Sequence, residues 1–341
     1  MSEKKTAFDI IQEERRKLVE IIIENLDKKG IEWFKEWSSL CTPHNGINGN
    51  EYHGGNKLKL GTIALLNDYK DPRWATFKQI ADKGYKLNKG AKGVVCEHWR
   101  FSKTIEEINA ETGEIEKKNV PLRSPSVSYF KVFNFTEVEG APPFEIPERI
   151  KDEKIQEVIR NLEKSSKCLI EYENQDRACY IPNKDVILLP NQDLFINDLA
   201  LASTLLHEMA HSTGHKERLD RDLTGEFGSP NYAREELRAE ISSMFLQNQL
   251  NLPVTDRQFE NNQEYIRSWI SILDKDPNEI YRASSDAEEI ANFIVKEYKG
   301  IEQTVELEKS IKEKEPQIQV VDILALKKEK EQEKELEMND D

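Results

Sequence analysis

The segment Leu205–His215, with the sequence LLHEMAHSTGH, places three of the six histidines of this 341-residue chain four residues apart. Four residues make about one turn of an α-helix, so His207 and His211 can direct their imidazoles to one point on the same helix face. The apolar residues around them indicate that this helix is buried. The HExxH spacing therefore predicts a zinc site on a helix, with Glu208 as the general base beside the water that zinc activates.

A third metal ligand is expected from the following helix, which begins near Pro230 and contains the sequence YAREELRAEIS. Glu236 and Glu240 lie about one turn apart on that helix. We expect Glu236 to bind the metal and Glu240 to hydrogen-bond a ligating histidine, as carboxylates beside metal sites commonly do. Glu235 is the alternative ligand. A solvated helix face is the other interpretation of these glutamates, but the apolar residues that follow predict a helix packed on one side.

The third histidine, His215, is less favoured as a metal ligand. On one straight helix it would lie ~12 Å along the axis from His207, which is too far for one ion to bind both. Gly214 also predicts that the helix ends just before it. We therefore expect a structural or substrate-side role for His215, with metal binding as the alternative.

Apolar periodicity along the chain predicts an α+β protein with two domains. Gly140 and the prolines after it mark a boundary, so an N-terminal domain is expected at 7–140 and a mainly helical domain with a small antiparallel sheet at 148–300. The charge-dense residues 304–341 are expected to form a disordered or loosely helical tail. Helices are expected at 7–38, 58–69, 76–84, 151–165, 193–214, 231–250, 259–273 and 284–298, and strands at 90–101, 127–135, 168–173 and 178–190, with a hairpin turn at Thr112-Gly113.

Composition argues against a membrane protein and against a secreted one. The chain has no run of eighteen apolar residues, and its charged N-terminus lacks the apolar core of a secretory signal. Its four cysteines are scattered without a CxxC pair. Such spacing indicates free thiols in a reducing compartment, so we expect a cytoplasmic protein.

Charge is distributed unevenly along the chain. The whole chain carries a net charge of −15, yet the window from Glu51 to Arg100 contains ten Lys or Arg and five Asp or Glu residues. One basic surface on an acidic molecule is typical of a protein that binds a polyanion. Local fluctuation in composition is the other interpretation.

Several segments together resemble a known family. HEMAHSTGHKERLDRDLTGEFGSPNYAREELRAEI, and YIPNKDVILLP before it, resemble the zincin-like metallopeptidase domain of ArdC-type antirestriction proteins. WFKEW, TPHNGINGNEYHGGNKLKL, DPRWATFKQIADKGYKLNKGAKG and KVFNFTEVEG resemble the N-terminal domain of that family, a single-stranded DNA-binding module also found in plasmid primases. The resemblance covers about residues 10–300 and implies a role in protecting the incoming DNA of conjugative plasmids or phages from restriction. It departs from the family pattern at Gly55, where we expect a large aliphatic residue.

The basic window has the residue types that single-stranded DNA requires, which are cations for phosphates and flat rings for bases. KGYKLNKGAKG is the expected contact loop, because its glycines let backbone amides approach phosphates. Burial in a core is the other interpretation for most of the rings, including Trp74 and Phe77. The candidate DNA contacts are Tyr52, Lys57, Arg73, Trp74, Lys78, Lys83, Tyr85, Lys86, Lys89 and Lys92, and His44, His53 and His98 are read as polar or nucleic-acid contacts.

Three functions are compatible with these features. The first is a zinc metallopeptidase that binds single-stranded DNA and cuts a nearby protein, for which a component of a restriction system is one candidate. The second is a non-enzymatic antirestriction protein that coats DNA and holds a structural metal, but a structural site does not need Glu208. The third, a primase accessory module, rests only on the shared N-terminal domain, since no acidic polymerase centre is evident.

Overall fold

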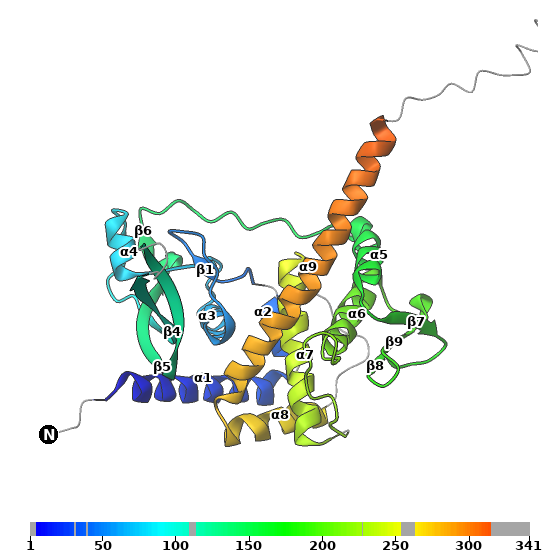
Figure 1. Ribbon diagram of the computed structural model, residues 1–341, viewed down its shortest axis with the longest axis horizontal. Coiled ribbons are helices and arrows are strands. Elements are labelled where there is room, and N and C mark those ends of the chain that lie inside the picture. Colours follow the sequence, from blue (N-terminus) through cyan, green and yellow to red (C-terminus); the bar gives the residue numbers. More distant parts are fainter. Residues whose placement is uncertain are drawn as a thin grey trace, which may run out of the picture. The chain divides into compact units, whose positions relative to one another are not determined.

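The computed structural model describes residues 5–30, 32–38, 40–108, 114–226, 228–253 and 263–314. In the first half of the chain, helices surround a four-stranded sheet with the order β1-β2-β5-β4, and a two-stranded sheet pairs β3 with β6 (Figure 1). Strands β1 and β2 are parallel, and the other neighbours are antiparallel. The elements are α1 Ala7–Lys29, α2 Glu32–Ser38, β1 His44–Asn45, α3 Gly54–Leu66, β2 Arg73–Thr76, α4 Phe77–Asp82, β3 Lys86–Leu87, β4 Val94–Ile108, β5 Ile115–Asn134, η1 Phe135–Glu137 and β6 Val138–Glu139.

The second half is mainly helical and carries a small sheet with the order β7-β9-β8. Strand β8 pairs antiparallel with β9 and is an edge strand, whereas β7 pairs parallel with β9 on the other side. The elements are η2 Asp152–Lys154, α5 Ile155–Ser165, β7 Leu169–Glu173, β8 Cys179–Ile181, β9 Val186–Pro190, η3 Gln192–Leu194, α6 Asp198–Ser212, α7 Pro230–Gln249, α8 Gln263–Lys275 and α9 Glu279–Lys314. The predicted α+β class is confirmed. The prediction that the small sheet is antiparallel is wrong, because the connection from β7 through β8 returns β9 parallel to β7 and makes the sheet mixed.

The two central helices of this half begin at well-formed caps. The side chain of Asn197 accepts a hydrogen bond from the backbone of Ala200 at the start of α6, and Ser229 accepts one from Tyr232 at the start of α7. Pro230 occupies the first turn of α7, where it costs no helical hydrogen bond. Both helices are buried along most of their length and pack against each other. This packing places α7 beside the HExxH segment of α6.

The N-terminal helices share the core of the second half. Leu18 and Ile22 of α1 and Trp37 of α2 belong to the same hydrophobic cluster as the buried residues of α5–α9. The ring of Trp37 lies 5.4 Å from that of Phe245 in α7, between ring centroids. Residues 7–38, which we expected in the N-terminal domain, therefore contribute to the core that carries the HExxH helix.

Several elements differ from their predicted bounds. The helix expected at 7–38, for example, is divided into α1 and α2. Strands β4 and β5 are longer than expected and pair as far as Ile108 and Ile115, while the turn predicted at Thr112-Gly113 lies outside the described residues. Helix α9 continues to Lys314, so residues 304–314 of the predicted tail are helical. Their Glu and Lys residues favour helix, which explains this continuation. Residues 315–341 of the predicted tail lie outside the described residues.

Residue contacts divide the chain into two units, Met1–Tyr298 and Lys299–Asp341. The candidate site and the three described sheets lie in the first unit. Among the described residues, no helix combines the length and the apolar composition needed to cross a membrane. The four cysteines are unpaired.

Candidate metal centre

The two histidines of the HExxH segment converge as their spacing predicts. His207 Nε2 and His211 Nε2 lie 3.1 Å apart on one face of α6. Both side chains are largely buried, with 4% and 13% of their surface exposed. Two imidazole nitrogens held this close and shielded from water can share one bound cation.

Glu236 of α7 supplies a carboxylate to the same point. Its Oε2 lies 3.5 Å from His207 Nε2, and its Oε1 lies 3.6 Å from His211 Nε2. One ligand atom from each of these three side chains lies within 4.8 Å of the others, and this is the only such group of His, Cys, Asp or Glu within the described ranges. Two imidazoles and one carboxylate are a donor set that suits a divalent ion such as zinc.

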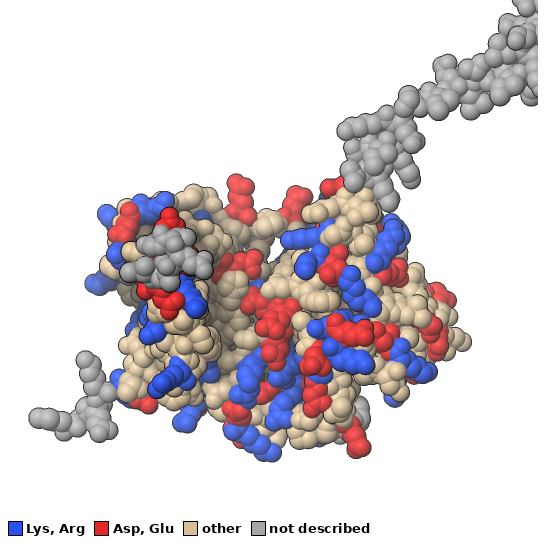
Figure 2. Space-filling view, in the orientation of Figure 1, with Lys and Arg blue, Asp and Glu red and all other residues tan. Residues whose placement is uncertain are grey.

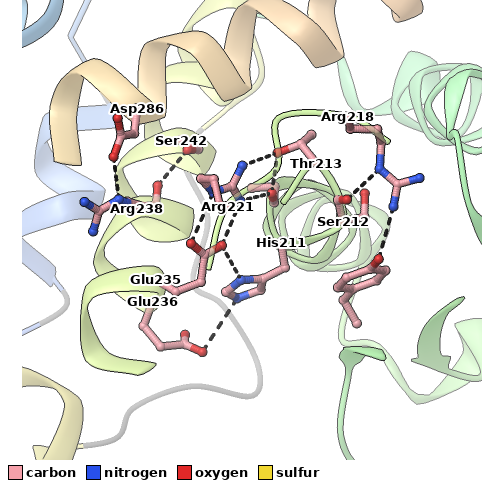
Figure 3. Close-up of polar contacts among 12 residues, drawn as sticks. His211, Ser212, Thr213, Arg218, Arg221, Glu235, Glu236, Arg238, Ser242 and Asp286 are labelled. Atoms are coloured by element: carbon pink, nitrogen blue, oxygen red, sulfur yellow. Dashed lines mark hydrogen bonds and ion pairs between the residues drawn. The ribbon is translucent and has the colours of Figure 1, made fainter. Parts of the chain in front are cut away.

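A second glutamate holds the outer side of the His211 ring (Figure 3). His211 Nδ1 lies 3.3 Å from Glu235 Oε1, and Arg221 donates to the same carboxylate at 2.7 and 3.2 Å. Arg221 is itself fixed by Thr213 Oγ1 at 2.7 Å and by the carbonyl of Ala210 at 2.8 Å. An Nδ1–H that donates to Glu235 leaves Nε2 as the lone-pair side of the ring, which faces the other candidate ligands.

Glu240 takes a comparable position beside the other histidine. Its Oε2 lies 3.7 Å from His207 Nδ1, and its side chain is buried. This distance is longer than a direct hydrogen bond, but the carboxylate faces the nitrogen that points away from Glu236. The structure thus places the expected orienting residue next to His207, and it places Glu235, the expected alternative ligand, next to His211 Nδ1.

The electrostatics of the cluster favour a bound cation. Burial alone would lower the pKa of His211, but the carboxylates of Glu236 and Glu235 outweigh it and raise that pKa to about 9. Burial would raise the pKa of Glu236, but His211 and His207 outweigh it and lower that pKa to about 2. The carboxylates therefore stabilise positive charge at the two histidines, which is where a divalent ion would bind.

A cavity of about 280 Å³ opens at the cluster. Glu208 lines it beside both histidines, and its side chain is buried. Cys179 of the edge strand β8 lines another wall, together with Tyr232 of α7. Burial and the nearby Glu236 raise the pKa of Tyr232, so its hydroxyl stays protonated and can donate a hydrogen bond. Tyr232 was not among the predicted site residues, although it precedes Glu236 by one helical turn.

His215 is not brought to this cluster. The helix ends after Ser212, and the chain turns so that His215 Nδ1 accepts a hydrogen bond from the backbone of Glu217 at 3.2 Å. A Cβ at Gly214 would lie 2.7 Å from Leu223, so this turn is tightly packed. His215 therefore belongs to the turn after α6 and stands apart from the candidate ligands.

The candidate DNA contacts divide into buried and exposed residues. Tyr52 and Trp74 are buried in the core between α3 and the main sheet, where the Tyr52 hydroxyl donates to the Trp74 carbonyl at 3.3 Å. Lys57 is 1% exposed, and its ammonium lies 3.5 Å from Glu288. Arg73 binds Asp71 at 2.6 Å and is largely buried. These four side chains have structural partners, so we do not include them in a DNA-binding surface.

The remaining candidates are a tyrosine, a histidine and five lysines. Tyr85 is half-buried and packs edge-on against Phe135, with 6.4 Å between ring centroids. His53 contacts Glu288 of α9 at 3.0 Å, although 72% of its side chain is exposed. The five exposed lysines, none of which forms an ion pair with another residue in the described part of the chain, are Lys78, Lys83, Lys86, Lys89 and Lys92.

Comparisons with known proteins match both halves. A family model described as the N-terminal domain of anti-restriction factor ArdC matches residues 12–133, and one described as a zincin-like metallopeptidase matches residues 157–286. These matches confirm the predicted two-domain organisation. The bounds 7–140 and 148–300 stay predictions.

Two kinds of relative are similar in sequence. The chain is 36% identical to the DNA primase TraC of Escherichia coli, over 82% of this chain and 26% of the primase. It thus spans about a quarter of that relative. The chain is also 30% identical to the uncharacterized protein y4eC of Sinorhizobium fredii, over 85% of this chain and 92% of that protein.

Two solved structures of the antirestriction protein ArdC from plasmid R388 are similar in fold. The metal-free structure superposes with a TM-score of 0.65 at 27% identity, over 84% of this chain and 98% of that chain. The Mn(II)-bound structure gives a TM-score of 0.65 at 26% identity, over 83% of this chain and 97% of that chain.

Proposed function

We propose, since the chain belongs to the family of ArdC-type antirestriction proteins, that it binds single-stranded DNA and hydrolyses peptide bonds at a zinc centre. The observation that carries the catalytic part is the convergence of His207, His211 and Glu236 beside Glu208 in one cavity. The DNA-binding part rests on the family of the N-terminal domain and on its exposed lysines. We infer that these two activities together protect mobile DNA from restriction.

The metal assignment follows from the donor set. His207, His211 and Glu236 would hold the ion, which leaves one position of a four-coordinate site open. The Mn(II)-bound ArdC of plasmid R388 supports a divalent ion in this family. We propose zinc, because two imidazoles and a carboxylate on an HExxH helix are typical of zinc hydrolases. A zinc ion there would polarise the peptide carbonyl and lower the pKa of water.

The surrounding residues would carry out the remaining steps. Glu208 would accept a proton from the attacking water and deliver it to the leaving amine. Tyr232 would donate its hydroxyl hydrogen to the carbonyl oxygen as negative charge develops there. The edge strand β8, whose Cys179 and Tyr180 line the cavity, offers unpaired backbone groups that can add an extended peptide as a further strand.

The basic surface supports nucleic-acid binding. Figure 2 shows Lys and Arg side chains at the upper left, where Figure 1 places α4. The five exposed lysines follow one another closely along the chain, from Lys78 in α4 to Lys92 before β4. Because no described carboxylate neutralises them, they are available to bind phosphates. Affinity should therefore fall as salt concentration rises.

The test of the catalytic proposal is the variant Glu208→Gln. We expect it to bind zinc as the wild type does but to cleave a mixed library of quenched fluorescent peptides at least about 100-fold more slowly, because the general base is lost. His207→Ala should lose both zinc and cleavage. Glu217→Gln, at an exposed glutamate in the turn after α6, is the matched control and should behave as the wild type.

The same variants separate the peptidase from a non-enzymatic protein. Restriction of incoming plasmid DNA is measured in cells that carry each variant. Equal protection by Glu208→Gln and wild type, together with no cleavage by the zinc-loaded wild type, would overturn the peptidase assignment. A protein that protects DNA by binding alone would then remain.

A further inference from the structure

One face of the β4–β5 hairpin carries aromatic rings outside the core. The strand register pairs Trp99 with Val127, and Tyr129 lies two residues further along β5. Directly paired residues and residues two apart project from the same face of a sheet, so both rings lie on one side. The opposite face carries Cys96 and Val132, which are fully buried against α3. One face of the hairpin thus packs in the core, and the other face carries aromatic rings that lie outside the core.

The Trp99 and Phe101 rings contact each other, and part of the surface of the hairpin's rings faces solvent. Phe101 is 65% exposed and Tyr129 is 40% exposed. The Trp99 and Phe101 rings stack at 20°, with 6.5 Å between centroids. The Trp99 indole N–H donates to Glu97 at 2.6 Å, and the Arg15 guanidinium lies 5.7 Å from the indole ring. Rings that are already ordered lose little conformational freedom when a ligand stacks on them.

Positive charge adjoins the rings. Lys131 lies two residues beyond Tyr129 on the same face and is exposed. Lys92 is also exposed and precedes Gly93, where a Cβ would lie 3.4 Å from that of Lys131. Neither lysine forms an ion pair with any residue that the structure describes. Both ammonium groups can therefore bind an anion.

A fourth exposed ring follows β2, the strand that pairs with β5. Phe77 is 62% exposed and begins α4 directly after Thr76, which pairs with Val132, the neighbour of Lys131 in β5. Exposed rings thus occur near Lys131 both in β5 and at the start of α4. We refer to Phe77, Trp99, Phe101 and Tyr129 as the aromatic strip.

We propose that the aromatic strip stacks the bases of single-stranded DNA while Lys92 and Lys131 bind its phosphates. The inference rests on the proposed DNA-binding function and identifies the surface that would bind the DNA. Stacking needs unpaired bases with accessible faces, which a duplex does not offer, so the strip would select single strands. The unpaired lysines favour this polyanion over an apolar protein partner, because a protein surface would leave them without counter-charges.

The test uses the full-length chain and a fluorescein-labelled oligothymidylate, with binding measured by fluorescence anisotropy. Phe101→Ala and Tyr129→Ala should each weaken binding about tenfold, through loss of one stacked base. Phe101→Trp should retain it, because a ring remains. Ile196→Ala, at a side chain 64% exposed in the second half of the chain, is the matched control and should bind as the wild type. Heparin, a polyanion without bases, should bind all four variants equally.

The outcomes distinguish this inference from the proposed function. Wild-type binding with unchanged affinity in Phe101→Ala and Tyr129→Ala would overturn the strip but leave DNA binding in place. A wild type that binds oligothymidylate no better than heparin would overturn the DNA-binding function, and the strip with it. Equal loss of oligothymidylate and heparin binding in the alanine variants would also overturn base stacking. Loss for oligothymidylate alone supports it.

Discussion

At the scale of the residue, the carboxylates around His211 differ because their neighbours differ. Glu236 faces the Nε2 atoms of both histidines, whereas Glu235 accepts hydrogen bonds from Arg221 and faces His211 Nδ1. A carboxylate engaged by a guanidinium has fewer lone pairs available for a metal. The tertiary contacts therefore favour Glu236 as the ligand in our proposal and Glu235 as a positioning residue.

The variant Glu235→Gln tests this positioning role. It removes the charge that holds Arg221 and the His211 ring, so zinc affinity should fall about 10- to 100-fold while one ion per chain still binds at high concentration. Competition with a coloured chelator measures the affinity. Glu171→Gln, at an exposed glutamate of β7, is the control and should leave affinity unchanged. An unchanged affinity in Glu235→Gln would remove the residue from the site.

At the scale of the element, one arginine attaches the β8–β9 hairpin to the end of α6. Arg218 donates to the carboxylate of Asp185 and to the Tyr180 hydroxyl at 3.1 Å. It also donates to the carbonyl of Ser212 at 2.7 Å (Figure 3). Asp185 has a positive φ of 52° in the turn between β8 and β9. The edge strand that lines the cavity is therefore held next to the HExxH helix by polar contacts.

The variant Asp185→Asn should lower the free energy of unfolding by about 1–2 kcal/mol at pH 7, through loss of a charge-assisted hydrogen bond. The hydrogen bond from Arg218 lowers the pKa of Asp185 below 3.8. A folded-state pKa below the unfolded value stabilises the protein above about pH 4, and this stabilisation is lost as pH falls through the folded pKa. The gap between wild type and variant should therefore close toward pH 3.

Urea unfolding followed by tryptophan fluorescence at several pH values measures this gap. Asp176→Asn, at an exposed aspartate of the β7–β8 connection, is the control and should match the wild type at each pH. A constant difference between Asp185→Asn and wild type from pH 7 to pH 3 would contradict an ionic origin of the stabilisation.

At the scale of the whole molecule, the two halves of Met1–Tyr298 are joined by buried contacts. The backbone N–H of Gly54 at the start of α3 donates to Glu288 of α9 at 2.7 Å, and Lys57 lies 3.5 Å from the same carboxylate. At Gly55, a Cβ would lie 2.0 Å from the ring of Tyr281 in α9. The large aliphatic residue that the family pattern led us to expect there would displace this buried ring.

The variant Gly55→Ala should lower the free energy of unfolding by about 3 kcal/mol, because the added methyl group overlaps the Tyr281 ring. Since α1, α2 and Leu58 of α3 share one hydrophobic cluster with the helices of the second half, calorimetry should show one cooperative transition at a lower temperature. Gly300→Ala, where a Cβ would meet nothing within 4 Å, is the control and should not lower the free energy of unfolding, because alanine favours the helix. Two separate transitions, or an unchanged melting temperature in Gly55→Ala, would contradict the joined packing.

Local spacing determined the parts of the fold and site that depend on near neighbours in the chain. The four-residue separation of His207 and His211 implies convergence on any straight helix. Pro230 indicates a helix start because its fixed φ suits the first turn. The family resemblance rests on the same short segments. For these features, helical geometry and capping are enough.

Only the tertiary structure decided which distant side chains meet. Sequence placed Tyr52, Lys57 and Trp74 among the DNA contacts, but packing buries all three, and the exposed rings of the N-terminal half include Phe77, Phe101 and Tyr129 instead. Composition gives the number of rings and charges in a segment but not the face on which each one lies. That choice depends on strand register and on the helices that cover each face, which are set by burial of apolar surface across the whole unit.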